Sequence, residues 1–240
     1  MWDSRTSGVE GRGVVSYNAP TESASQSDYY TDTRHPGRKP SVGIERGSIW
    51  SGFRQGPDKQ NCVTVSAIKA AMMRFGQKPT DIFNHVKVAG DGYNVEMRDG
   101  FRLHLSKREL EEATYRSQFM GDDSAMLADA NFLYAASAKR AQLENNDGYA
   151  SQGFGRALYS LNDGEDGYEG LQHLGLGAHI RETTVDNLAR GQLGVVTHGI
   201  RRGDQVFGHS LAVINGREEV WGNQGGYPPA NVKAHALALV

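Results

Sequence analysis

The sequence predicts an α+β protein in which helices precede most of the strands. Apolar residues recur at helical spacing through residues 62–75 and 124–144. Short β-type runs separated by turn residues follow near the end of the chain, at 194–198, 209–214 and 219–221. This order indicates a helical lobe over about residues 48–175 and an antiparallel β lobe over about 176–240.

The first helix is expected from Cys62 to Phe75. Its apolar positions are three and four residues apart, and Gly76 supplies a stop signal. A second, short helix is expected at 80–86.

A β-hairpin is expected next, because apolar and polar residues alternate on both sides of Asp99-Gly100. Ser106 and Glu109 then have the spacing of a capping box, which predicts a helix ending near Ser117. A long, alanine-rich core helix follows at 124–144. Two shorter helices are expected among glycines, at 154–161 and 167–174.

Residues 1–47 differ from the rest of the chain. They are rich in Ser, Thr, Gly, Asp and Pro and poor in aliphatic residues, so they predict a flexible leader ahead of an ordered domain at 48–240. No apolar signal core is present at the N-terminus. We therefore expect a cytoplasmic protein, or one secreted without a cleavable signal.

Composition narrows the classes of function. A net charge of −2 over 240 residues gives no phosphate-binding footprint, so a nucleic-acid partner is not expected. No apolar run approaches the ~20 residues that a membrane span needs. The single cysteine rules out an intramolecular disulfide. The histidines lack the close spacing of metal ligands, so neither a metal site nor a cofactor is expected.

That cysteine, Cys62, follows a polar turn and opens an apolar helix. The partial positive charge at a helix N-terminus favours thiolate over thiol. The position therefore suits a nucleophile that attacks a carbonyl, provided that a histidine reaches it.

The other groups needed for such an attack have candidates. His209 begins a β-type run after a turn and is the expected base, with His198 as its main competitor. Asn223 is the expected group that orients the imidazole, and Gln224 or Glu219 are alternatives. The candidates for an oxyanion donor are Gln55 and Gln60, beside the backbone N–H of Cys62.

These residues resemble the papain-like cysteine proteases, and most of all the calpain-type catalytic core. Gln55-Gly56 followed by Asn61-Cys62 is similar to the family's cysteine-helix motif. The segments Gly208-His209-Ser210-Leu211-Ala212-Val213 and Trp221-Gly222-Asn223-Gln224-Gly225-Gly226 are similar to its histidine and asparagine blocks. The resemblance covers roughly residues 48–228, and the order Gln, Cys, His, Asn agrees.

The resemblance implies a papain-like fold and a cysteine peptidase that takes a protein or peptide substrate, and a monomer is favoured. Two alternatives keep the same fold. A glutamine deamidase or transglutaminase would use the same acyl-enzyme, and bacterial secreted effectors with a disordered leader include both types. A binding module that has lost activity is the other alternative.

Overall fold

The computed structural model describes residues 37–57, 59–202, 205–230 and 234–240, and every structural statement below concerns these residues. The chain is a mixed α+β protein, as predicted. Its helices are α2 (Cys62–Phe75), α3 (Pro79–Ile82), α4 (Lys107–Ser117), α5 (Ser124–Glu144), α6 (Phe154–Ser160), α7 (Gly167–Gln172) and α8 (Val185–Ala189). Short 3-10 turns lie at Asn146–Gly148, Ala150–Gln152 and Gly177–His179.

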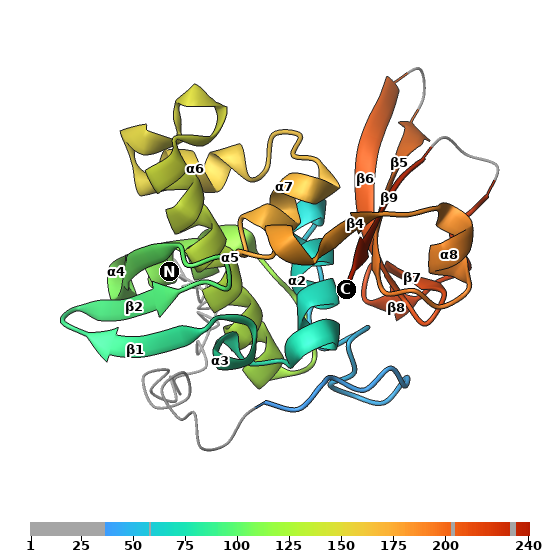
Figure 1. The fold of residues 1–240 in the computed structure, drawn as a ribbon, viewed down its shortest axis with the longest axis horizontal. Coiled ribbons are helices and arrows are strands. Elements are labelled where there is room, and N and C mark those ends of the chain that lie inside the picture. Colours follow the sequence, from blue (N-terminus) through green and yellow to red (C-terminus); the bar gives the residue numbers. More distant parts are fainter. Residues whose placement is uncertain (1–36, 58, 203–204, 231–233) are drawn as a thin grey trace, which may run out of the picture.

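Helix α2 lies between the helical half of the molecule and the larger sheet (Figure 1). It packs on strand β6 of that sheet and on α7, and it also contacts α5. Every residue from Val63 to Met72 is buried, because both sides of the helix are covered. The predicted bounds of this helix are confirmed, including its end at Gly76, whose φ is 129°.

The helical half also contains a three-stranded antiparallel sheet in the order β1 (His85–Ala89), β2 (Gly92–Glu96) and β3 (Arg102–Ser106). The predicted hairpin at Asp99-Gly100 is confirmed, since Glu96 pairs with Arg102 across it. The helix expected at 80–86 is wrong beyond Ile82. Val86 belongs instead to β1, opposite Val95, because a buried cross-strand partner outweighs local helix propensity.

The larger sheet has six strands in the order β4-β9-β5-β6-β7-β8, and all its pairs are antiparallel. The strands are β4 (Ile180–Glu182), β5 (Gly194–Arg202), β6 (Gln205–Ile214), β7 (Arg217–Val220), β8 (Asn223–Gln224) and β9 (Ala234–Leu239). The expected runs at 194–198, 209–214 and 219–221 correspond to β5, β6 and β7. Strands β4, β8 and β9 were not predicted.

Both faces of the six-stranded sheet are covered. The side chains of Ala212 and Ile214 join the large core shared with α2 and α5. Leu211 and Val213 alternate with them and form a smaller core with Leu188 of α8. The sheet is therefore sandwiched between α2 and α8.

The capping box at the start of α4 is confirmed, since Ser106 Oγ accepts from the Glu109 N–H while Glu109 accepts from the Ser106 N–H. Helix α5 is buried along most of its length, as expected of a core helix. Within the described residues, no helix is long and apolar enough to cross a membrane.

The predicted leader boundary at residue 47 is too late. The Ile49 N–H donates to Ser41 O at 2.9 Å, and Trp50 Nε1 donates to Val42 O at 2.6 Å. The Gln77 N–H reaches Arg38 O at 3.2 Å. Residues 37–47 are thus bound to the domain, whereas residues 1–36 of the predicted leader lie outside the described residues.

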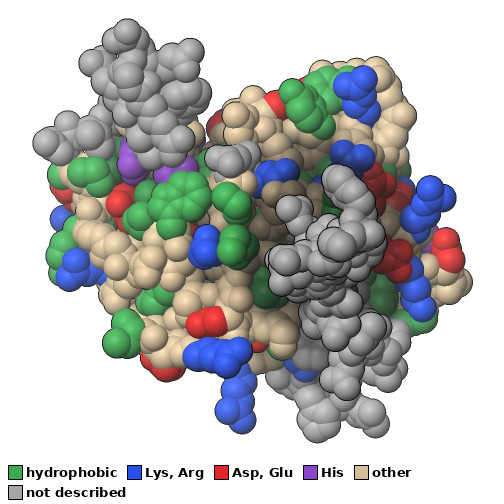
Figure 2. Space-filling view, turned by 180° about the vertical axis from the view of Figure 1, so that it is seen from behind, with side chains coloured by type: hydrophobic (Ala, Val, Ile, Leu, Met, Phe, Trp, Pro, Cys, Tyr) green, Lys and Arg blue, Asp and Glu red, His purple; other side chains and the backbone are tan. Residues whose placement is uncertain are grey.

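Basic and acidic side chains are interspersed over the face seen in Figure 2. This distribution agrees with the small net charge of −2.

The close approach of α7 to α2 yields a first prediction. A Cβ placed on Gly170 would lie 2.6 Å from Val63 Cγ1 and 3.1 Å from Val63 O, beside the candidate nucleophile. We therefore expect Gly170→Val to lower the free energy of unfolding by about 1–3 kcal/mol through overpacking. Denaturant unfolding measures the change.

Gly177→Val is the matched control, because a Cβ there meets no atom within 4 Å. Equal losses in the two variants would contradict the tight α2–α7 contact.

Candidate functional site

One face of α2 carries a polar stripe that meets the six-stranded sheet. Cys62, Ser66 and Lys69 are spaced four and then three residues apart, so they lie along one side of the helix. Ser66 Oγ is 2.8 Å from Ser210 Oγ on β6, and Lys69 Nζ is 3.7 Å from Glu219 Oε1 on β7. The stripe therefore joins the helix to two neighbouring strands.

Cys62 is the first residue of α2, as predicted. The preceding Asn61 does not cap the helix with its side chain, whose Nδ2 donates instead to Ser117 O at 3.1 Å. The first-turn N–H groups are therefore left to other acceptors. The backbone N–H groups of Ser210, Val63 and Cys62 itself lie near enough to the sulfur to lower its pKa.

Burial has the larger effect, and it raises the pKa of the Cys62 thiol above its ordinary value. The N–H groups at the start of the helix act in the expected direction, but burial outweighs them, so the environment favours the thiol over the thiolate. A base that accepts the thiol proton is needed for attack at neutral pH.

Cys62 opens into a narrow pocket of about 10 Å³, which has room for roughly one water molecule. The lining comes from α2, from the segment before it, and from β6 and β7 with the turn that follows. The lining residues are Gln55, Cys62, Val65, His209, Ser210, Leu211, Glu219 and Trp221. Three residues predicted from the sequence, Gln55, Cys62 and His209, thus meet at one pocket.

His209 lies on β6, directly opposite His198 on β5. Its ring stacks on Trp221, with 6.0 Å between the ring centroids and 22° between the ring planes. His198, the competing base, forms an ion pair in which its Nε2 is 3.3 Å from Glu218 Oε1. Of the two histidines, His209 is the one that lines the pocket with Cys62.

The two glutamines proposed for the oxyanion differ in placement. Gln55 is buried, lines the pocket, and donates from Nε2 to Lys59 O. Gln60 is exposed. The placement favours Gln55 as the side-chain donor, with the N–H of Cys62 beside it.

The three candidates for the group that orients the imidazole also differ in placement. Asn223 and Gln224 form β8 and are exposed, and Asn223 Nδ2 donates to Trp221 O at 3.3 Å. Glu219 is 5 % exposed and lines the pocket with His209. Glu219 Oε1 accepts from the Gly222 N–H at 2.5 Å. Of the three candidates, Glu219 is the one placed at the pocket.

Lys69 is a polar residue beneath the site that the sequence analysis did not single out. It is fully buried, and burial lowers its pKa to about 8, against the opposing effect of Glu219. The sequence carried a signal, because a lone charge interrupts the apolar run of α2 two helical turns after Cys62. A charge in such a run is buried only when it is paired.

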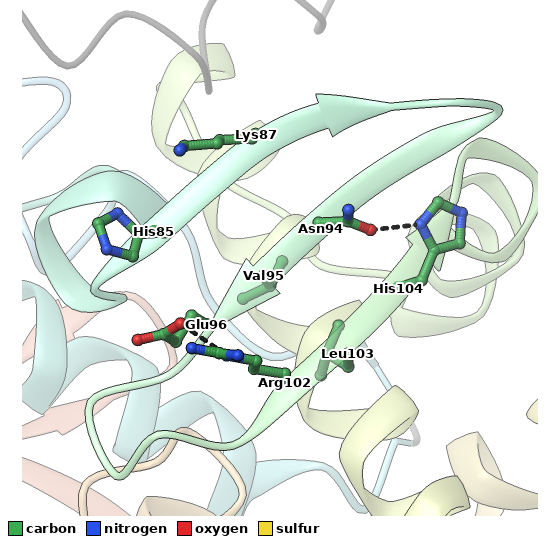
Figure 3. A pocket seen from close by; sticks show the side chains of 8 residues that line it. All are labelled: His85, Lys87, Asn94, Val95, Glu96, Arg102, Leu103 and His104. Atoms are coloured by element: carbon green, nitrogen blue, oxygen red, sulfur yellow. Dashed lines mark hydrogen bonds and ion pairs between the residues drawn. The ribbon is translucent and has the colours of Figure 1, made fainter.

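A larger hollow of about 420 Å³ lies on the outer face of the three-stranded sheet (Figure 3). Its lining residues are His85, Lys87, Asn94, Val95, Glu96, Arg102, Leu103 and His104. Arg102 pairs with Glu96 at 2.8 Å, and His104 Nδ1 lies 2.9 Å from Asn94 Oδ1. Because this set holds no activated nucleophile, the hollow is a less suitable reaction site than the pocket at Cys62.

A cluster of carboxylates offers the best metal-ligating geometry among the described residues. Oxygen atoms of Asp147, Asp163 and Glu165 lie within 4.8 Å of one another, and both aspartates are exposed. Burial and the neighbouring Glu169 raise the pKa of Glu165 to about 9. A cation bound at this cluster would have to compete with the proton on Glu165.

Comparison of the chain with protein-family models, with curated proteins and with solved structures found no match.

The raised pKa of Cys62 yields a second prediction. The folded state keeps the thiol proton to a higher pH than the unfolded state, which releases it near pH 8.5. The stability contributed by the protonated thiol is present in full below about pH 8.5 and is lost as pH rises toward the folded-state pKa. Relative to Cys62→Ser, the wild-type protein should therefore lose stability as pH rises above about 8.5.

Denaturant unfolding of both proteins across this range measures the difference. A difference that stays constant would show that the fold leaves the thiol pKa unchanged, and one that grows in favour of the wild type would show that the site stabilises the thiolate.

Proposed function

We propose that this chain has a papain-like arrangement and is a cysteine peptidase whose nucleophile is Cys62 and whose base is His209. The observation that carries the proposal is the shared pocket, where residues from three separate segments of the chain line one small cavity. The nucleophile begins a helix that packs on an antiparallel sheet, and the imidazole belongs to that sheet. The chain order of Gln55, Cys62 and His209 agrees with the resemblance to calpain-type proteases.

The proposed reaction begins at a neutral thiol, because burial raises the pKa of Cys62. His209 accepts the thiol proton while Sγ attacks the scissile carbonyl carbon and the C–S bond forms. The C–N bond then breaks, and the imidazolium returns its proton to the leaving amine. Water, deprotonated by His209, hydrolyses the thioester, which releases the acid and restores the thiol.

The negative charge that develops on the carbonyl oxygen needs preorganised donors. The N–H of Cys62 and the side-chain amide of Gln55 are the proposed donors, since both groups belong to residues that line the pocket. Withdrawal of one such donor commonly lowers kcat by about 10²–10³-fold.

The size of the pocket bears on how a substrate is held. A cavity of about 10 Å³ admits a carbonyl oxygen or a water molecule but no amino-acid side chain. In the proposed complex, an extended peptide therefore lies across the mouth of the pocket, where Trp221 is 44 % exposed. Only the reacting carbonyl group enters.

The proposal is tested with a thiol-directed epoxysuccinyl or iodoacetamide probe at neutral pH, together with a proteome digest. We expect Cys62→Ser to abolish labelling at this site and His209→Ala to slow it by about 10²-fold or more, because the base is lost. New peptide N-termini in the digest, absent with Cys62→Ser, identify a peptidase.

His104→Ala is the matched control, because His104 lies on β3 and is held by Asn94 and Asp91, away from the pocket. Equal labelling of wild type and His209→Ala would overturn the assigned base. Conversion of glutamine to glutamate in substrates, without cleavage, would favour a deamidase of the same fold. A wild-type protein that does not label would favour a binding module.

A further inference from the structure

The carboxylate of Glu219 sits where α2, the strand β7 and the turn after β7 meet. It is 5 % exposed, lines the pocket, and accepts the Gly222 N–H at 2.5 Å. Lys69 of α2 is its charged partner. Lys69 Nζ lies 3.7 Å from Glu219 Oε1, which is an ion-pair distance rather than a hydrogen bond. Glu219 therefore connects the helix that bears Cys62 to the turn beyond β7.

That turn carries the stacking partner of the imidazole. Trp221 has a φ of 52° and Gly222 a φ of 84°, so two successive residues occupy the left-handed region. A non-glycine residue rarely adopts this conformation unless its surroundings hold it there. The bond from Gly222 to Glu219 supplies one restraint, and the close approach of Gly222 to Arg54 Cδ, 2.5 Å from an added Cβ, supplies a second.

Lys69 is the buried counter-ion that stabilises the charged carboxylate of Glu219. Its ammonium group donates to Ile49 O at 2.5 Å and to Trp50 O at 3.0 Å, and it lies 4.7 Å from the centroid of the Phe53 ring. A buried ion pair gains little stability over apolar packing, so its value lies in the geometry it specifies. Here the specified geometry is that of the turn holding Trp221 against His209.

We propose that Glu219 is a positioning residue for His209, acting through the Gly222 N–H and the stacked ring of Trp221, with Lys69 as its buried counter-ion. This proposal rests on the proposed function, because it assigns a partner to the base of that reaction. It places the positioning group on β7, one residue before the strand ends, rather than on the exposed amides of β8.

The experiment compares two double variants that remove both buried charges. Lys69→Met/Glu219→Gln keeps an oxygen that accepts the Gly222 N–H, whereas Lys69→Met/Glu219→Ala does not. Because neither variant leaves a lone charge in the core, both are expected to fold. Far-UV circular dichroism and thermal unfolding check this before the reactivity is measured.

The readout is the rate of Cys62 alkylation by iodoacetamide between pH 5.5 and 10. In the wild type, transfer of the thiol proton to His209 should sustain the reaction near neutral pH. The Gln-containing variant should keep that profile. The Ala-containing variant should lose about 10-fold or more of the rate at pH 7 and resemble His209→Ala, with reaction only where the thiol ionises by itself.

Glu218→Gln controls for the loss of a buried carboxylate in general, because Glu218 is the adjacent residue and forms its own ion pair with His198. We expect it to keep the neutral-pH reaction. If His209→Ala loses that reaction while both double variants retain it, the positioning role of Glu219 is wrong and the proposed function stands. If His209→Ala reacts like the wild type, the proposed function itself fails.

If the Ala-containing variant does not fold, Trp221→Ala supplies the second test, since Trp221 is exposed and its loss leaves the core intact. Loss of the neutral-pH reaction in Trp221→Ala supports positioning through the ring. Full retention of that reaction contradicts it.

Discussion

The docking of α2 on one face of the six-stranded sheet, over strand β6, is the constraint on which the rest of the site depends. Most of the contact between helix and sheet is apolar, which supplies attraction but little register. The polar stripe adds the register, because Ser66 meets Ser210 and Lys69 meets Glu219. A buried polar group without its partner is expensive, so a shift of the helix by even one turn is strongly disfavoured. The same register sets Cys62 at the pocket that His209 lines.

Burial gives the site its electrostatic character. It raises the pKa of Cys62 and lowers that of Lys69, so each group resists its charged form. A thiol in this state is a poor nucleophile until an imidazole takes its proton, which makes the placement of His209 decisive. The narrow pocket excludes bulk water, and charges and dipoles act more strongly there than at the surface.

Local patterns were sufficient to predict several parts of this fold. The bounds of α2, the hairpin at Asp99-Gly100 and the capping box at Ser106 all follow from interactions between residues close in sequence. Strand β9 could not be predicted from local patterns. Its alternating Ala and Leu residues carry no strong β preference, and its partners β5 and β4 are distant in the chain. Strand β1 was mistaken in part for helix, although Val86 and Val88 favour a strand and its partner β2 follows after a short turn.

The candidate site was likewise predictable only in part from the sequence. Residue type and chain order were sufficient to select Cys62, His209 and Gln55, and the fold brings all three to one pocket. The choice among Asn223, Gln224 and Glu219 depends on the backbone of the turn at Trp221 and Gly222, which no sequence spacing specifies. The most direct measurement is the distance from Cys62 Sγ to the nearer imidazole nitrogen of His209 in a crystal structure. We predict about 4 Å or less; a longer separation, with another side chain between the sulfur and the imidazole, would contradict the account.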